Sequence, residues 1–381
     1  MAEDVYEEFR IKVREWLIKN TPESLRRREL LSPVVGGGVE EKINELKAWH
    51  KKVYEAGFIG IWWPKEYGGY EDDPVKEIIV YEEFMKFGAP LGNPASILGL
   101  TVVGPILLIA GTEEQKKKYL KRILTGEDIW CEGLSEPAAG SDLASIQTEA
   151  IDKGDHFIIR GQKIWSSYAH LADYMLLLAR TGRPEDRYKN LTLMIVDMKS
   201  PGITVKPIKQ ITGLSEFNIE YFDDVKVPKE NVIGKVNEGW KLVVQALNFE
   251  RLLLMPPTII SAEIAAKEVI RSKVIKNIEQ IEDEILDILA VKILYERVFD
   301  LLKRKIIPGP EVASVKIVAT DAAQKLYRKA VEEGDYSILF RESNLFGLTF
   351  GLLSSFVGTI GGGTNEVLRN LIGEHVLKLP K

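Results

Sequence analysis

An indole followed by two hydroxyls, Trp165-Ser166-Ser167, ends a segment whose residue types suit a flat heterocyclic ligand. The segment begins at Trp130, and its residues 135–142 are rich in small and hydroxyl side chains, which let a ligand approach the backbone closely. Residues 148–160 alternate apolar and polar side chains around the turn at 152–155, as a β-hairpin does. An aromatic side chain beside two serine hydroxyl donors, all carried on strands, fits a planar ring with hydrogen-bond acceptors along its edge. A flavin is such a ring.

Each of these residues also has an ordinary structural interpretation. Ser135 and Ser167 can be turn or strand hydroxyls, and an isolated tryptophan such as Trp165 is more often a core residue. The run Gly361-Gly362-Gly363 ahead of a predicted helix can be a hinge, or it can leave helix N–H groups open to the polar edge of a ligand. Taken one at a time, the residues favour the structural interpretation.

Hydrolytic or metal chemistry has little support in this sequence. Its four histidines are scattered without ligand spacing, at His50, His156, His170 and His375. The single cysteine, Cys131, has no neighbouring sequence feature that would activate a thiolate, and one cysteine excludes a disulfide within the chain. We therefore expect no metal site, no nucleophilic hydrolase and a reducing, cytoplasmic environment.

Composition indicates a large globular protein. The chain has 381 residues, of which 45% are hydrophobic and 28% charged, enough for two or three domains. Its net charge of −5 argues against nucleic acid as a partner. No apolar run reaches the ~18 residues of a membrane span, and the acidic start of the chain does not read as a signal peptide. We expect a soluble protein that does not bind membranes.

Hydrophobic periodicity divides the chain into helical, β and helical parts. A period near 3.6 predicts helices at 4–19, 42–55, 74–87, 93–110 and 112–124, the last opened by the capping-box pair Thr112 and Gln115. A period of two follows the hairpin and predicts strands at 174–180, 191–197, 203–207 and 218–227. Helices then resume at 240–255, 258–276, 281–306, 311–334, 345–356 and 365–377.

This order predicts an α+β protein with a central antiparallel β domain between two helical parts. We expect an N-terminal helical domain at 1–126, the β domain at 127–235 and a C-terminal helical bundle at 236–381.

In this arrangement the sequence resembles the acyl-CoA dehydrogenase family of flavoproteins. The matching segments span nearly the whole chain in the order of that family. They are WWPKEYGG at 62–69, GTEEQKKKYL at 111–120, LSEPAAGSD at 134–142, GQKIWSSYAHLADYMLLLART at 161–181, FDDVKVPKENVIG at 222–234 and GGGTNEVLRNLIGEHVL at 361–377.

The resemblance implies an activity, a cofactor and partners. It implies non-covalent FAD, an acyl-CoA substrate and α,β-dehydrogenation of its thioester to the trans-2-enoyl-CoA, as in fatty-acid and lipid degradation. The flavin N5 takes the β-hydride, and the electrons pass to an electron-transferring flavoprotein. It also implies a homotetramer built as a pair of dimers, or a dimer.

The same resemblance assigns residues to the site. The loop that contacts the flavin is matched by Leu134, Ser135, Gly140 and Ser141, and the tripeptide along the isoalloxazine by Trp165, Ser166 and Ser167. The segment that touches FAD at the start of the last helix is matched by Thr364, Asn365 and Glu366. The substrate thioester or pantetheine is expected near Ser141, with Arg251 and Gly363 also on the substrate side.

The base that removes the α-proton is expected at Glu250. Most members of the family carry it in a Tyr-Glu-Gly-Thr segment, which here reads Gly361-Gly362-Gly363-Thr364, so Gly362 stands where the glutamate is expected. A minority, including isovaleryl-type and long-chain-type enzymes, carries it on another helix directly before a family arginine, where this chain has Glu250-Arg251. Apolar neighbours such as Val243 and Val244 predict that this helix is largely buried. The alternative is that Glu250 only pairs with a neighbouring cation.

Two family motifs are missing. The Arg-x-x-Phe-Gly and Gln-x-x-Gly-Gly segments, which meet the FAD bound mainly by a neighbouring subunit, are replaced by SKVIKNIEQIEDEI and SILFRESNLFGLTF. This pattern resembles the branch with heteromeric steroid-side-chain enzymes, in which two related chains share each FAD. A hetero-oligomer with a second chain of this family, in which this chain is a non-catalytic flavin-binding partner, is therefore an alternative, and a flavin oxidase or monooxygenase on the same fold is another. The glycines at 361 and 362 favour a branched or bulky acyl group.

Overall fold

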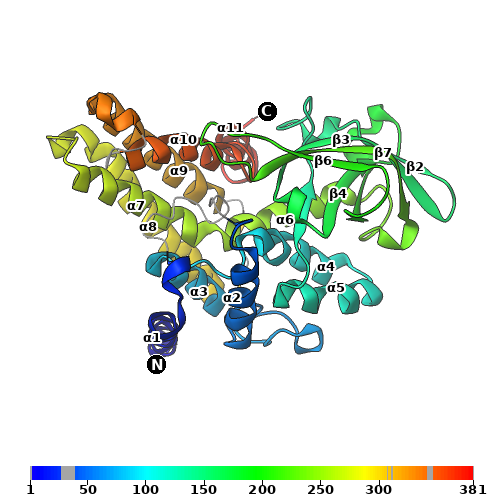
Figure 1. The fold of residues 1–381 in the computed structure, drawn as a ribbon, viewed down its shortest axis with the longest axis horizontal. Helices are drawn as coiled ribbons and strands as arrows, with labels where there is room; N and C mark the ends of the chain where they lie inside the picture. Colours follow the sequence, from blue (N-terminus) through cyan, green and yellow to red (C-terminus); the bar gives the residue numbers. More distant parts are fainter. Residues whose placement is uncertain (1, 27–38, 307, 310–311, 341–345, 381) are drawn as a thin grey trace. The chain divides into compact units, whose positions relative to one another are not determined.

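The computed structural model describes residues 2–26, 39–306, 308–309, 312–340 and 346–380 (Figure 1). Contacts within the chain define two compact units that interleave along the sequence. The first, here the helical unit, comprises residues 1–36, 73–91 and 251–381, and the second, the sheet unit, comprises 37–72 and 92–250.

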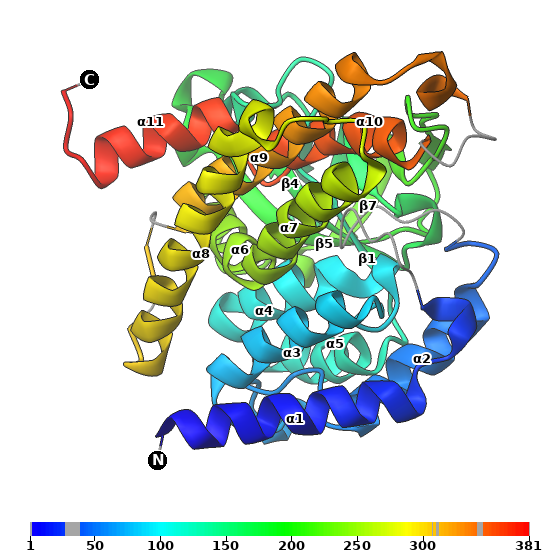
Figure 2. The ribbon, with the colours of Figure 1, turned by 90° about the vertical axis from the view of Figure 1, so that its left-hand side faces the viewer.

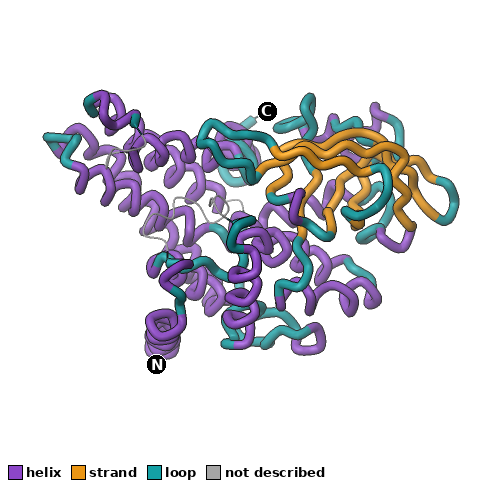
Figure 3. Tube along the Cα trace, in the orientation of Figure 1, coloured by secondary structure: helices purple, strands orange, loops and turns teal. Residues whose placement is uncertain are grey.

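A seven-stranded sheet, orange in Figure 3, forms the centre of the sheet unit. Its strands follow the order β1-β4-β2-β3-β7-β6, and β5 pairs with β4. Their bounds are β1 Trp130–Gly133, β2 Glu149–Asp152, β3 His156–Ser167, β4 Tyr174–Arg180, β5 Leu191–Asp197, β6 Ile203–Pro207 and β7 Phe217–Pro228. The predicted hairpin is β2 and the start of β3, paired antiparallel from Glu149 opposite Arg160.

The sheet is mixed, and the prediction of purely antiparallel pairing was wrong in this respect. β1 runs parallel to β4 along its whole length, and Glu149 of β2 makes a parallel contact with Arg180 of β4. The other strand pairs are antiparallel. Alternation of side chains shows that a segment is a strand, but it says nothing about the direction of its neighbour.

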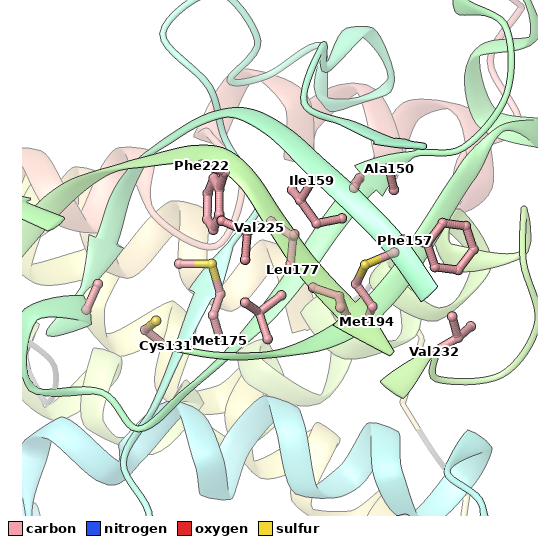
Figure 4. Packing of buried hydrophobic residues seen from close by; sticks show 14 residues of the cluster. Cys131, Ala150, Phe157, Ile159, Met175, Leu177, Met194, Phe222, Val225 and Val232 are labelled. Atoms are coloured by element: carbon pink, nitrogen blue, oxygen red, sulfur yellow. The ribbon is translucent and has the colours of Figure 1, made fainter. Parts of the chain in front are cut away.

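One face of the sheet buries a closely packed apolar cluster (Figure 4). Most of its members come from β1 to β5 and β7, and they include Cys131, Phe157, Leu177, Met194 and Phe222. Buried and exposed positions alternate along much of β7, whereas β4 and β5 are buried on both faces. The cluster packs the first part of β3, at Phe157 and Ile159, and the candidate site residues Trp165 and Ser167 lie farther along the same strand.

Helices complete the sheet unit. They are α2 Ile43–Glu55, α4 Gly104–Ala110, α5 Glu113–Thr125 and the greater part of α6 Gly239–Leu253. The capping box at the start of α5 is present, since the Thr112 hydroxyl accepts from the Gln115 N–H and the Gln115 side chain accepts from the Thr112 N–H. A π-helical turn at Gly99–Val103 interrupts the helix predicted for 93–110.

The helical unit is organised around one long helix, α9. Its helices are α1 Ala2–Asn20, α3 Pro74–Phe87, α7 Met255–Ser272, α8 Glu282–Lys303, α9 Val312–Glu333, α10 Phe346–Ile360 and α11 Asn365–His375. α9 contacts α7, α8, α10 and α11, and α1 lies beside α3 (Figure 2). The buried face of α9 is rich in alanine, including Ala313, Ala319 and Ala322, which lets neighbouring helices approach closely.

The predicted fold class is confirmed: helical parts flank a sheet part in the expected order. The division into three consecutive domains at 126 and 235 stays a prediction. Among the described residues, no helix is long and apolar enough to cross a membrane.

Candidate functional site

A buried ion pair fixes the loop between β1 and β2. Lys163 of β3 has no solvent exposure, and its Nζ donates to the Glu136 Oε1 at 2.9 Å and to the Leu134 carbonyl at 2.8 Å. The Glu136 carboxylate also accepts from the backbone N–H groups of Gln147 and Thr148, at 2.6 and 2.8 Å. The pair therefore holds the start of the predicted ligand loop and ties it to the residues just before β2.

Burial and pairing act in opposite directions on these charges. Burial lowers the pKa of Lys163 to about 8, although Glu136 opposes the shift. Burial would raise the pKa of Glu136, but Lys163 and the Gln147 N–H outweigh it and hold that pKa below its usual range. The pair is ionised at neutral pH, and Lys163 is a cation inside the protein.

Trp165 is exposed because β3 bulges there. The register of β3 against β7 shifts between Ile164 and Ser166, and Trp165 has a φ of +70°, in the left-handed region that a bulky residue rarely adopts. The side chain is 55% exposed, and its ring meets Phe217 edge-on at a centroid distance of 6.4 Å. The indole is therefore a plate on the surface of the sheet unit, as the ligand interpretation requires, and not a core residue.

The two serines after Trp165 differ. Ser166 is buried, and its hydroxyl donates to the Glu220 Oε2 at 2.7 Å, so this hydroxyl points away from a surface ligand. Ser167 is half-buried and pairs with Phe217 of β7. Burial raises the pKa of Glu220 to about 8, so this carboxyl is neutral at pH 7. Of the two predicted hydroxyl donors, only Ser167 has its side chain open to a ligand.

The loop residues lie next to Trp165 through the backbone. The Ser135 carbonyl accepts from the Ile164 N–H at 3.0 Å, and within the described part of the chain no acceptor is bonded to the Ser135 N–H. Gly140 and Ser141 are exposed. A Cβ added to Gly140 would meet nothing within 4 Å, so the protein's own packing does not require glycine there. A ligand that approaches the loop closely would be a reason for glycine at this position.

Glu250 lies near the end of α6 in the sheet unit. It is half-buried, and its neighbour Phe249 stacks on Trp62 with ring centroids 6.3 Å apart and planes 6° from parallel. Val243 is buried but Val244 is exposed, so the helix is less buried than its apolar residues predict. The helix breaks at Leu254, directly before Pro256 and Pro257 in the first turn of α7.

Glu132 of β1 is a functional candidate that sequence reasoning missed. Its Oε1 is buried and has no hydrogen-bond partner among the described residues. Burial, and then the charge of Glu250, raise its pKa well above the usual range. Burial, and then the charge of Glu220, raise the pKa of the Cys131 thiol, which argues against a nucleophile there. An acidic residue inside the apolar strand WCEG was the available signal.

In the helical unit, two cations hold the glycine run before α11. The Arg251 Nε donates to the Gly362 carbonyl at 3.0 Å, and the Lys316 Nζ donates to the Gly363 carbonyl at 2.9 Å. Gly362 and Gly363 have φ values of +66° and +95°, which glycine adopts without steric cost. Arg251 therefore orients the turn that carries Gly362.

The start of α11 uses its polar side chains internally. The Thr364 hydroxyl caps the helix by accepting from the Val367 N–H at 3.3 Å. Asn365 is buried, and it accepts from Lys316 and donates to Thr320 and Asp321. Glu366 is exposed. The first-turn N–H groups, the Thr364 O–H and Glu366 are the groups of this segment that could contact a ligand.

The candidate residues thus belong to two units. The sheet unit carries Leu134, Ser135, Gly140, Ser141, Trp165, Ser166, Ser167 and Glu250, and the helical unit carries Arg251, Gly363, Thr364, Asn365 and Glu366. The boundary between the units falls inside α6, between Glu250 and Arg251. No group of three or more His, Cys, Asp or Glu side chains that could hold a metal ion occurs in the described ranges.

Family models match most of the chain, apart from the segment that carries α6 and α7. The acyl-CoA dehydrogenase N-terminal domain matches residues 7–127, the middle domain residues 131–225 and the C-terminal domain residues 278–377. The chain is 32% identical to acyl-CoA dehydrogenase IpdE1 of Mycolicibacterium smegmatis, over 98% of each protein. It is 38% identical to IpdE1 of Mycobacterium tuberculosis over 246 residues, which cover 64% of this chain and 63% of that protein.

Solved structures agree. The fold matches one described as "Tcur3481-Tcur3483 steroid ACAD", with a TM-score of 0.84 and 28% identity over 99% of this chain and 98% of the other. It also matches the ChsE4-ChsE5 complex from Mycobacterium tuberculosis, with a TM-score of 0.78 and 28% identity over 99% and 98% of the two chains. The chain belongs to the acyl-CoA dehydrogenase family of flavoprotein oxidoreductases. The resemblance seen in the sequence is confirmed.

Replacement of Glu220 by glutamine should remove a pH-dependent cost of folding. Because burial raises the pKa of Glu220 from 4.5 to about 8, the folded chain retains a proton that the unfolded chain loses as the pH rises through this window. The contribution of Glu220 to folding stability therefore falls from pH 4.5 to 8, by about 1.4 kcal/mol per pH unit. We expect the stability advantage of Glu220→Gln to grow across this window in denaturant unfolding.

The matched control is Asp223→Asn, an exposed acid on the same strand. It should follow the pH dependence of the wild type. A Glu220→Gln variant whose advantage is constant from pH 5 to pH 8 would show that Glu220 is ionised in the folded protein.

Proposed function

We propose that this chain catalyses the FAD-dependent α,β-dehydrogenation of an acyl-CoA thioester to the trans-2-enoyl-CoA, with Glu250 as the base. The observation that carries this proposal is the exposed Trp165 plate beside the fixed Ser135 N–H, on a chain of the acyl-CoA dehydrogenase family. Bound FAD supplies the acceptor for the β-hydride. An electron-transferring flavoprotein then removes the electrons.

The residues of the sheet unit fit one face and one edge of a flavin. Trp165 offers an aromatic face, the Ser135 N–H and the Ser167 hydroxyl offer donors, and Gly140 leaves room at the loop. Ser166 contributes through the backbone, because its hydroxyl is bonded to Glu220. In the helical unit, the first-turn N–H groups of α11 would meet a polar part of FAD.

We expect Glu250 to remove the α-proton, and its charge acts on the nearby Glu132 carboxyl. Two carboxyl groups in one water-poor environment do not both ionise easily. Burial, and then the charge of Glu250, raise the pKa of Glu132 well above its usual range. Arg251 is a positioning residue in this mechanism, because its guanidinium holds the Gly362 carbonyl.

The Glu250→Gln variant should bind FAD and acyl-CoA but lose substrate-dependent bleaching of the flavin. Glutamine keeps the size of the side chain and removes the base, a change typically worth about 10²- to 10⁴-fold in rate. Anaerobic stopped-flow absorbance with a panel of linear, branched and bulky acyl-CoA substrates measures the effect and also identifies the acyl group.

The control is Glu238→Gln, an exposed glutamate just before α6, which should bleach at the wild-type rate. Bleaching of Glu250→Gln at the rate of this control would end the assignment of the base. Binding of FAD by Glu250→Gln, seen in its absorbance spectrum, separates lost chemistry from lost cofactor.

Gly140→Ala should weaken FAD binding by about tenfold or more without lowering the thermal midpoint. The added methyl meets no protein atom within 4 Å, so any penalty must arise from a ligand close to the loop. Fluorescence titration of the apoprotein with FAD gives the affinity. Ala138→Ser, an exposed change in the same loop, is the control, and equal FAD affinity in the two variants would place the flavin away from Gly140.

A second candidate function is that of a flavin-binding subunit that completes the site of another chain. It is favoured by the two missing motifs for the FAD of a neighbouring subunit, and by the similarity to chains of the ChsE4-ChsE5 complex. On this reading, each FAD is shared between this chain and a related one.

The isolated chain distinguishes the two functions. If it acts with an obligate partner, it should purify with substoichiometric FAD and show little bleaching by acyl-CoA until the partner is added. Mass photometry and the ratio of flavin to protein absorbance measure assembly and occupancy. A homotetramer with one firmly bound FAD per subunit would exclude the obligate partner.

A further inference from the structure

Lys163 places a positive charge directly behind the wall of the proposed flavin site. Its ammonium is fully buried and bonded on one side to Glu136 and on the other to the Leu134 carbonyl. The Glu136 carboxylate balances this charge overall, so the pair acts as a dipole whose positive end also contacts the Leu134 carbonyl. Inside a protein such a charge is poorly screened and acts over longer distances than in water.

The Leu134 carbonyl and the Ser135 N–H belong to the same peptide group. A cation bonded to the carbonyl oxygen withdraws electrons from that group and makes its N–H a stronger donor. The Ser135 carbonyl is held by the Ile164 N–H, so the residue cannot turn freely. No acceptor in the described part of the chain uses the Ser135 N–H, which leaves this polarised donor for the ligand.

We propose that Lys163 is an electrostatic positioning residue that makes the bound flavin easier to reduce. This inference rests on the proposed function, and it assigns Lys163 a role beyond holding the loop in place. Reduction adds negative charge to the flavin, and a fixed donor with a cation behind it stabilises the reduced form more than the oxidised form. A purely structural lysine would hold the loop equally well for both forms.

The ratio of flavin affinities in the two redox states separates these roles. Lys163→Met removes the positive charge and keeps most of the apolar stem of the side chain. The double variant Lys163→Met/Glu136→Gln also removes the negative charge that the single variant leaves unpaired, so we expect the double variant to be the more stable of the two. The equilibrium constant for two-electron reduction of the bound FAD should fall at least tenfold in both, which corresponds to about 30 mV. This equilibrium constant is measured by equilibrating the flavoprotein with a reference dye during slow anaerobic reduction, with FAD in excess.

Lys226→Met is the matched control, since Lys226 is an exposed lysine on β7 of the same sheet, and it should keep the wild-type constant. If the flavin-loaded double variant keeps the wild-type equilibrium constant for flavin reduction, this inference is wrong. A loss of affinity that is equal for oxidised and reduced FAD also overturns it, because that is the signature of a loop held in place and nothing more. A wild-type chain, with or without its partner, that takes up no FAD overturns the proposed function and this inference with it.

Discussion

The ion pair between Lys163 and Glu136 is the interaction on which the sheet side of the site depends. Buried ion pairs contribute little net stability, because desolvation offsets most of their attraction, but loss of one partner typically costs about 3–5 kcal/mol. Such a pair determines where the segments that carry it lie more than it stabilises the fold. Here it ties the loop after β1 to the middle of β3 and so places Leu134 and Ser135 beside the strand that carries Trp165.

The bulge at Trp165 is the second constraint, and it depends on the ladder around it. A bulky residue with positive φ costs on the order of 1–3 kcal/mol and persists only where the surroundings impose it. Regular pairing resumes on both sides, with Ile164 opposite Ile219 and Ser166 opposite Asn218. The Asn218 side chain also donates to the Ser166 carbonyl at 2.9 Å. Strain at one residue turns a strand side chain into an exposed plate.

Most of the fold could be predicted from the sequence, because periodicity and caps are local properties. Thr112 and Gln115 close their capping box, and the strands β4 to β6 begin and end where alternation predicted. Features that depend on neighbours could not be predicted. Neither the parallel pairing of β1 with β4 nor the bulge at Trp165 has a signal within its own segment.

In the candidate site, too, local features could be predicted from the sequence and features that depend on neighbouring segments could not. Residue types drew attention to Ser135 and Trp165, but the sequence offered no way to see that the Ser166 hydroxyl points into the protein, toward Glu220. Glu132 was overlooked because a lone acid in a short strand acquires meaning only when the fold brings Glu250 near enough to shift its pKa. The assignment of individual residues to FAD and substrate stays a prediction.

The glycine at position 362 is explained by the backbone as well as by the loss of a catalytic side chain. Gly362 and Gly363 form two consecutive left-handed positions, and their carbonyls accept from Arg251 and Lys316. A glutamate at 362 with this φ would bear a steric cost of about 1–2 kcal/mol. The turn is therefore built for its carbonyls and not for a side chain. If the base is Glu250, α6 supplies both the catalytic carboxylate and, at the next residue, the Arg251 guanidinium that holds this turn. The base can therefore move from position 362 to position 250 while the turn is kept.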